Sequence, residues 1–184
     1  VGKSYAAFFD DLDRVVQCRR PLAIVGMRGA GKSSLARRIG SDLRLRVVDT
    51  DQEFQKKHGD ICPFIATHGW EAFRREEAAV IQSCLQEKDI VLACGGGAVE
   101  TPAVRAMLKK HAIVLWVQAS EEELCKRLSR GERPRLTDLP LREEVRLFLE
   151  KRTPFFREVS TFTLSAHIPF SRQVPVVQIG RAHV

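Results

Sequence analysis

The sequence predicts an α/β fold in which helices cover both faces of a parallel sheet. Short, nearly continuous apolar runs alternate along the chain with longer segments whose apolar residues recur every three to four positions. Such runs are typical of parallel strands, which are buried on both faces and connected by helices. A glycine-rich loop also stands between the first apolar run and the first amphipathic segment. With 184 residues and no internal repeat, the chain is expected to contain one α/β domain.

The first half of the predicted fold is strand, helix, strand and helix. Residues 21–27 predict a buried strand, and residues 34–43 predict the helix that leaves the glycine-rich loop. A second strand is predicted over 45–50. The short helix expected over 52–59 ends at Gly59, because glycine readily adopts the backbone conformations that close a helix.

The middle of the chain continues the alternation. Good helix formers with regularly spaced apolar residues predict a helix over 70–86, and a strand over 89–97 follows and ends in three glycines. Thr101 and Pro102 then have the residue types of a helix cap and first turn, which predicts a helix over 103–111.

The last part of the predicted domain contains two more strands. Ser120 and Glu123 have the spacing of a capping box, which marks the start of a helix directly after a buried strand. The predicted elements are a strand over 112–119, a helix over 121–129, a polar loop over 130–140, a helix over 141–156 and a last strand over 161–166.

Composition narrows the class of protein. The chain is 44% hydrophobic and 29% charged, as in ordinary globular proteins, and no apolar run approaches the roughly 20 residues that cross a bilayer. Its five cysteines are scattered and form no C-x-x-C pair, so we expect reduced thiols rather than disulfides or a zinc site. The formal charge of +7 favours anionic partners, and the basic residues lack the interleaved aromatics of a nucleic-acid surface. Small anions are therefore the expected ligands.

The glycine-rich loop matches a phosphate-binding motif. Residues 26–33, GMRGAGKS, fit G-x-x-x-x-G-K-[ST], with a predicted strand before them and a predicted helix after them. Lys32 is expected to reach the β- and γ-phosphates of a nucleotide, and Ser33 to hold Mg²⁺. The alternative is a glycine-rich turn that binds no ligand. The predicted ATP-binding residues of this loop are Gly29, Ala30, Gly31, Lys32, Ser33 and Ser34.

Two aspartates follow the second predicted strand. Asp49 and Asp51 should lie at the edge of the sheet where ligands bind in parallel α/β folds. One carboxylate could act on metal-bound water and the other on an acceptor hydroxyl. The alternative for either aspartate is a helix cap.

Three further features could complete a site. Arg74 could be fixed by Glu77 three residues later, although Arg74 and Arg152 could equally be solvated surface residues. Three successive glycines after Cys94 let the backbone approach a ligand closely and offer N–H groups to an anion. Arg133 lies in a polar loop where a cation could arrive when a lid closes, or belong to a charged surface loop.

The motifs GMRGAGKS, DTD, GWEAFRREE, CGGG, ERP and KRTPFF occur in the order, and at nearly the spacing, of the shikimate kinases, and the chain resembles that family over residues 20–166. The resemblance implies a P-loop NTPase fold like that of nucleoside monophosphate kinases, with a five-stranded parallel sheet and a mobile lid. It also implies that the phosphoryl group of Mg²⁺-bound ATP is transferred to the 3-hydroxyl of shikimate.

The resemblance also implies roles for individual residues. Lys32 and Arg133 would neutralise the transferred phosphate, Arg133 from the lid. Asp49 would hold Mg²⁺ through water, together with Ser33, and Asp51 would bind the acceptor hydroxyl and accept its proton. The implied shikimate-binding residues are Asp51, Trp70, Phe73, Arg74, Gly96, Gly97 and Arg152. Because the lid sequence RPRL departs from the family, the arginine that stacks on adenine is either Arg127 or Arg130.

The chain divides into four parts on this interpretation. Residues 20–166 form the kinase domain, and residues 1–19 form a leading helix or linker. Residues 167–178, with two prolines, do not resemble the C-terminal helix of the family, and residues 179–184 resemble a translated sequencing adapter. Because the chain starts at Val1 and carries the leading segment, we expect a piece of a larger polypeptide similar to the multifunctional arom protein.

Two other functions remain open. A related small-molecule kinase, such as a gluconate kinase or a nucleotide kinase, would share the fold and the phosphate loop. A kinase-like domain that only binds ATP would be expected to lack Lys32, Asp51 or Arg133, and all three are present. The expected partners are ATP and shikimate rather than nucleic acid or a membrane. The expected location is the cytoplasm, or a plastid if a transit peptide has been lost.

Overall fold

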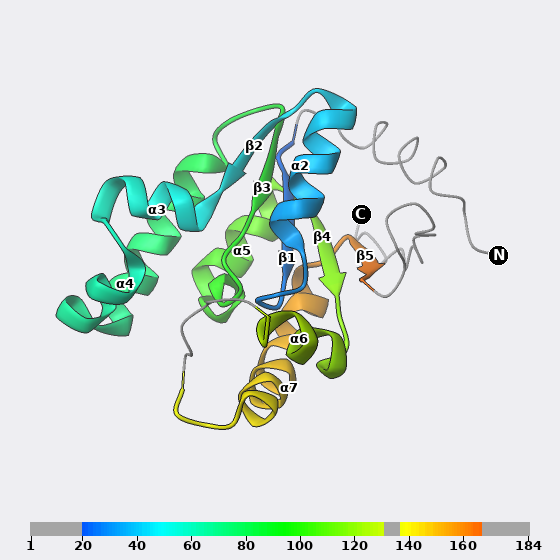
Figure 1. The fold of residues 1–184 in the computed structure, drawn as a ribbon. Helices are drawn as coiled ribbons and strands as arrows, with labels where there is room; N and C mark the ends of the chain where they lie inside the picture. The colour runs from blue at the N-terminus through cyan, green and yellow to red at the C-terminus, as the bar shows by residue number, and fades with distance from the viewer. Residues whose placement is uncertain (1–19, 131–136, 167–184) are drawn as a thin grey trace.

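The computed structural model describes residues 20–130 and 137–166, which form a parallel five-stranded sheet (Figure 1). The strands lie in the order β2-β3-β1-β4-β5, and every neighbouring pair is parallel. This confirms the predicted class of fold, and each strand falls within its predicted range. The strands are β1 (Leu22–Gly26), β2 (Arg46–Asp49), β3 (Ile90–Ala93), β4 (Ile113–Gln118) and β5 (Phe162–Ser165).

Helices cover both faces of the sheet. Helix α2 contacts β1, β2 and β3 and lies in front of the sheet in Figure 1, whereas α5 lies behind it and contacts β4, α4 and α7. The helices are α2 (Lys32–Leu43), α3 (Thr50–His58), α4 (Ile61–Cys84), α5 (Pro102–His111), α6 (Glu121–Leu128) and α7 (Leu141–Val159), with a short 3-10 helix η1 (Ala98–Glu100).

The central strand β1 organises the core. Leu22, Ala23 and Ile24 are fully buried between β3 and β4, as their continuous apolar sequence predicts. Burial of a leucine or isoleucine side chain stabilises the folded state by about 1.5–3 kcal/mol, so this strand is a major source of stability. Because all five strands are parallel, the loops that follow β1, β2 and β3 meet at one edge of the sheet, and the candidate site lies there.

Helix α4 differs most from the prediction, because it begins at Ile61 rather than near residue 70. Gly69 interrupts it with φ 82° and ψ 167°, which divides α4 into two helical halves. The first half was not predicted, since Pro63 and Gly69 suggest a loop. Pro63 lies in the first helical turn, however, where proline is tolerated. Phe64 of this half packs edge-on against Phe54 of α3, with ring centroids 5.1 Å apart.

The predicted caps fare differently. Ser120 and Glu123 form the complete capping box at the start of α6. At the start of α5 the predicted boundary is correct and Pro102 occupies the first turn, but the Thr101 side chain makes no capping hydrogen bond. The proline itself, with its preset backbone angle and no N–H to satisfy, accounts for this helix start.

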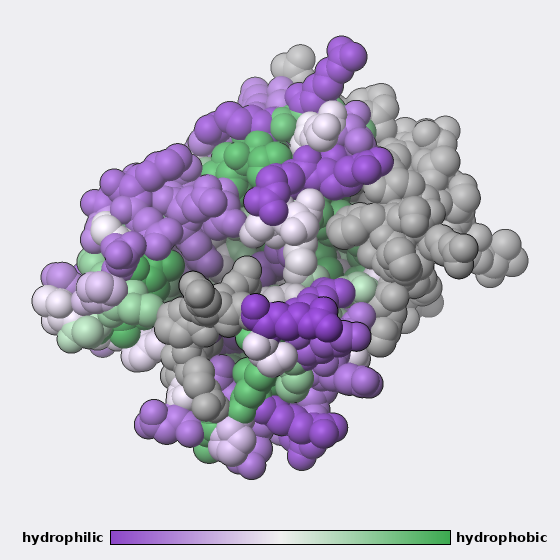
Figure 2. Space-filling model, in the orientation of Figure 1, coloured by the Kyte–Doolittle hydropathy of each residue, from purple (hydrophilic) through white to green (hydrophobic). Residues whose placement is uncertain are grey.

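Some predictions fall on residues outside the described ranges. These are the leading helix, the lid with Arg133, and the tail from residue 167. Figure 2 shows a surface that is mainly hydrophilic on the face of Figure 1, with smaller hydrophobic areas. Within residues 20–130 and 137–166, no helix is both long and apolar enough to cross a membrane.

Candidate active site

The phosphate loop connects β1 to α2. Gly29 and Gly31 have φ angles of 82° and 98°, in the left-handed region that glycine occupies without strain. Gly31 is the N-cap of α2 and brings no side chain to the helix end, so backbone N–H groups of the first turn remain for an anion. The Lys32 ammonium donates a hydrogen bond to the Met27 carbonyl, at 3.1 Å, and lines the adjoining cleft.

Asp49 links the phosphate loop to the second strand. Its carboxylate accepts a hydrogen bond from the Ser33 hydroxyl at 2.8 Å and another from the Asp51 backbone N–H at 3.1 Å. Asp49 is therefore a cap of α3 as well as the partner of Ser33. A hydroxyl and a carboxylate are hard oxygen ligands, and Mg²⁺ typically takes few such ligands from a protein alongside phosphates and water. The Ser33–Asp49 pair fits that ion.

Asp51 lies in a helix rather than at the end of the strand where it was predicted. The β2–β3 pairing ends at Asp49, so Asp51 belongs to the first turn of α3 rather than to the strand end. The carboxylates of Asp51 and Glu77 both lie close to Gly95. A Cβ atom on Gly95 would come within 2.7 Å of both carboxylates, which explains this first glycine. Burial raises the pKa of Glu77, against the lowering effect of the nearby Arg74.

Arg74 and Arg152 occupy the far end of the same site. Arg74 is paired with Glu77 at 2.7 Å, as the sequence spacing predicts. Arg152 is only 3% exposed, and its Nε donates to Glu100 at 2.7 Å. A Cβ atom on Gly97 would overlap the guanidinium of Arg74. The fold therefore brings both arginines to the glycine turn, and neither is a freely solvated surface residue.

Two aromatic side chains flank Arg74. Its guanidinium carbon lies 5.4 Å from the ring centre of Trp70 and 5.3 Å from that of Phe73. Phe73 is buried, whereas Trp70 is 48% exposed although it lines the cleft. An exposed aromatic ring at a cleft is a ready contact for the apolar face of a small ligand.

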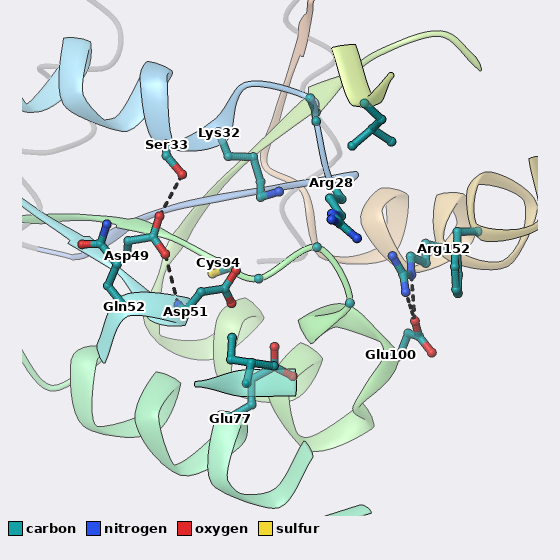
Figure 3. A pocket seen from close by; sticks show the side chains of 18 of the residues that line it. Arg28, Lys32, Ser33, Asp49, Asp51, Gln52, Glu77, Cys94, Glu100 and Arg152 are labelled. Atoms are coloured by element: carbon teal, nitrogen blue, oxygen red, sulfur yellow. Dashed lines mark hydrogen bonds and ion pairs between the residues drawn. The ribbon is translucent and has the colours of Figure 1, made fainter. Parts of the chain in front are cut away.

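A cleft of about 1900 Å³ is lined by the phosphate loop, both aspartates, the glycine turn and both arginines. Figure 3 shows Lys32, Asp51 and Arg152 arranged around the same space, with the side chain of Arg28, from the phosphate loop, between Lys32 and Arg152. A typical small-ligand pocket has a volume of about 300–1,000 Å³, so this cleft can hold two ligands at once. The predicted site residues on its wall are Gly29, Ala30, Gly31, Lys32, Ser33, Ser34, Asp49, Asp51, Trp70, Phe73, Arg74, Gly96, Gly97 and Arg152.

Sequence reasoning missed Glu100, and it named Arg127 only as one of two candidates for adenine contact. Glu100 pairs with Arg152, which lies 52 positions away in the sequence, so no local pattern signals the contact. Arg127 donates to the carbonyls of Gly29 and Ala30 at 3.3 and 3.0 Å, which fixes it against the phosphate loop. Arg130 lines the cleft as well, and the choice between these two arginines for adenine contact stays a prediction.

Comparisons of sequence and of structure with known proteins both find shikimate kinases. The profile of the family described as shikimate kinase matches residues 28–175. The shikimate kinase of Nitrobacter winogradskyi is 39% identical over 153 residues, which cover 82% of this chain and 72% of that protein. The shikimate kinase of Bordetella pertussis is 38% identical over 146 residues, covering 78% and 69%.

A solved structure agrees with these sequence matches. The shikimate kinase from Acinetobacter baumannii in complex with shikimate superposes with a TM-score of 0.78 at 30% identity, covering 86% of this chain and 90% of that one. The family profile extends over most of the chain, from Arg28 within the phosphate loop through the glycine turn and both arginines. The chain therefore belongs to the shikimate kinase family.

Proposed function

We propose that this protein transfers the γ-phosphoryl group of ATP to the 3-hydroxyl of shikimate. One observation carries the proposal beyond family membership: a single cleft is lined by the phosphate loop, by Asp51 and by the arginine pair. A phosphate donor bound at one end and a carboxylate-bearing acceptor bound at the other would meet at Asp51. The arrangement fits an alcohol acceptor that also carries a carboxylate.

The phosphate end of the cleft would bind and orient ATP. Backbone N–H groups of Gly29 to Lys32 would surround the β-phosphate, and the Lys32 ammonium would follow the γ-phosphoryl group as it moves. Ser33 and Asp49 would hold Mg²⁺, Asp49 through water. When bound, the ion neutralises charge on the phosphates.

Asp51 would bind the acceptor hydroxyl and act as its general base. Its carboxylate can accept the hydroxyl hydrogen bond, orient the oxygen toward the phosphate and take its proton during transfer. The neighbouring Glu77 is buried and accepts a hydrogen bond from Arg74 at 2.7 Å, so we assign its carboxylate to orienting that arginine.

Arg74 and Arg152 would bind the carboxylate of shikimate. A guanidinium donates two parallel hydrogen bonds to a carboxylate, and two such groups would fix the acceptor remotely from the reacting hydroxyl. The backbone of Gly96 and Gly97 would supply further donors, and Trp70 and Phe73 would contact the ring. We also propose residues 20–166 as the kinase domain, with β5 as its last strand.

A panel of acceptors tests the assignment directly. ADP release from ATP would be measured with shikimate, gluconate and nucleoside monophosphates, and the phosphorylated product identified by mass spectrometry. We expect turnover with shikimate and phosphorylation at the 3-hydroxyl. Turnover with gluconate or a nucleotide in place of shikimate would favour a related kinase, and binding of ATP without transfer to any acceptor would favour a non-catalytic domain.

A further inference from the structure

Glu100 is surrounded by the cations of the acceptor end of the cleft. One carboxylate oxygen accepts from Arg152 through two nitrogens, at 2.7 and 2.6 Å, and lies 3.8 Å from a terminal nitrogen of Arg74. The other oxygen pairs with Lys151 at 2.5 Å. Glu100 ends the 3-10 helix η1, directly after the glycine turn, and its side chain is 17% exposed.

These contacts occupy only part of each arginine. A guanidinium carries five N–H donors in a planar fork. Glu100 engages Nε and one terminal nitrogen of Arg152, and Glu77 engages one terminal nitrogen of Arg74. The bonds fix the orientation of both forks while leaving donors for a second carboxylate.

We propose that Glu100 is a positioning residue, a built-in carboxylate that holds Arg74 and Arg152 in the orientation in which they bind the carboxylate of the acceptor. The proposal rests on the function proposed above. Glu100 would affect the affinity for the acceptor through its contacts with the arginines and would not touch the acceptor itself.

Electrostatics explains why the arginine pair needs such a partner. Burial, together with the like charge of Arg74, lowers the pKa of Arg152, and Glu100 opposes both effects. Without an internal anion, two guanidinium groups and Lys151 would repel one another in a partly buried site. The Arg152 guanidinium also lies 4.0 Å from the ring centre of Phe148, so Glu100 fixes its edge and Phe148 fixes its face.

Glu100 is itself held from behind. Arg105 of α5 donates to the carbonyls of Val99 and Glu100 at 2.8 and 3.2 Å, and its Nε donates to Glu158 of α7 at 2.9 Å. The same guanidinium lies 4.3 Å from the ring centre of Phe155. The backbone that carries Glu100 is therefore tied to α7, the helix that carries Arg152.

A competing role for Glu100 predicts the opposite change in the KM for shikimate. If Glu100 merely competed with the acceptor for the arginines, removing its charge would strengthen acceptor binding and lower the KM for shikimate. A positioning role predicts weaker binding, because the forks lose their alignment. The sign of the change in KM separates the two.

The test compares Glu100→Gln with a matched control, Glu121→Gln. Glu121 also pairs with two arginines of α7, Arg142 and Arg146, but is not among the residues that line the cleft. We expect Glu100→Gln to raise the KM for shikimate by about tenfold, the size of effect expected when a charge-assisted contact is lost. The KM for ATP and kcat should change by less than about twofold, and Glu121→Gln should leave all three constants unchanged. Glu100→Asp, which keeps the charge, should recover part of the affinity.

The carboxamide of shikimate makes the test specific to the carboxylate. With this acceptor, wild type and Glu100→Gln should have similar KM values, because the group that the arginines recognise is absent. An unchanged or lowered KM for shikimate in Glu100→Gln would overturn the positioning role, as would an equal loss with both acceptors. If the wild-type enzyme did not distinguish shikimate from its carboxamide, the arginine clamp of the proposed function would fail instead.

Discussion

Lys32 places a positive charge where the phosphoryl group would move, on a side chain already held by the Met27 carbonyl. Lys32→Ala removes this charge but not the loop backbone. Turnover should therefore fall by about 10²-fold or more, as expected for loss of one preorganised electrostatic group. The measurement is the initial rate of ADP release at saturating ATP and shikimate.

Lys56→Ala is the matched control for Lys32→Ala. Lys56 is 68% exposed and pairs with Glu53, three residues earlier in α3. Its removal should leave kcat within about twofold, since an exposed ion pair contributes little. If Lys32→Ala also kept its turnover within a few-fold of wild type, the loop would not be catalytic.

Asp51→Asn tests the proton and orientation role at the centre of the cleft. The amide keeps the shape of the side chain but is a poorer acceptor and not a useful base. We expect ATP binding, followed by fluorescence titration, to change little, while transfer to shikimate falls by about 10²-fold or more. Loss of ATP affinity equal to the loss of turnover would assign Asp51 to the nucleotide instead.

At the scale of elements, substitutions at two glycines have different expected costs: steric overlap at Gly97 and backbone strain at Gly69. Gly97 has an ordinary φ of −105°, but an added Cβ would overlap Arg74. Gly97→Ala should therefore raise the KM for shikimate, by about tenfold if one charge-assisted contact is lost, with little loss of stability.

At Gly69 an added Cβ atom would lie in open space, but the backbone has φ 82° and ψ 167°. Gly69→Ala should therefore lower the free energy of unfolding by about 1–3 kcal/mol, because only glycine adopts this conformation without strain.

Steady-state kinetics and chemical denaturation of both glycine variants check this division. A Gly97→Ala enzyme with unchanged KM would show that Arg74 does not need the space above the glycine turn. A Gly69→Ala protein as stable as wild type would show that the two halves of α4 can realign without cost.

The elements differ in how far the sequence could predict them. The buried strands were predictable because parallel strands need no alternation, and β1 and β4 are continuous apolar runs. The phosphate loop and the two aspartates followed from local motifs and from the common strand edge. The first half of α4 was missed because Pro63 and Gly69 are poor helix residues. Its stability depends on packing of Phe64 against Phe54, which local sequence does not encode.

Residues that act through distant partners were equally out of reach. Glu100 gains its role only when α7 brings Arg152 beside η1. A glutamate after a glycine turn has no distinguishing spacing, so its contacts could be identified only in the folded chain. Arg127 was a candidate for adenine contact, but its hydrogen bond from α6 to the phosphate loop has no local sequence signal.

At the scale of the whole molecule, the acceptor end of the cleft should couple folding to pH. Burial tends to raise the pKa of Glu100, but its bonds to Lys151 and Arg152 and the charge of Arg74 outweigh burial and lower it from its ordinary value of 4.5. A carboxyl with a lowered folded-state pKa stabilises the fold above its unfolded value, and this contribution disappears as the pH falls through the folded value. The stability difference between wild type and Glu100→Gln should therefore be largest near neutral pH and shrink below about 4.5.

Urea denaturation at several pH values measures this difference. Glu77, whose pKa is raised mainly by burial, has the opposite effect on the pH dependence of stability. Its contribution to the stability of the fold is lost as the pH rises from its unfolded pKa through its higher folded pKa. A stability difference for Glu100→Gln that stayed constant between pH 7 and strongly acidic pH would contradict the ionised state assigned to Glu100.

The fold brings Arg74 of α4 and Arg152 of α7 to one glycine turn, and the account depends on their joint recognition of the acceptor carboxylate. Lysine keeps the charge but lacks the planar fork, so Arg74→Lys and Arg152→Lys test geometry rather than charge. The most direct measurement is the KM for shikimate of each variant, determined beside the KM for ATP. We predict that each substitution raises the KM for shikimate about tenfold or more and leaves the KM for ATP unchanged, as expected for loss of a charge-assisted contact to one substrate. Unchanged KM values for shikimate in both variants would contradict the clamp and, with it, the assignment of the acceptor site.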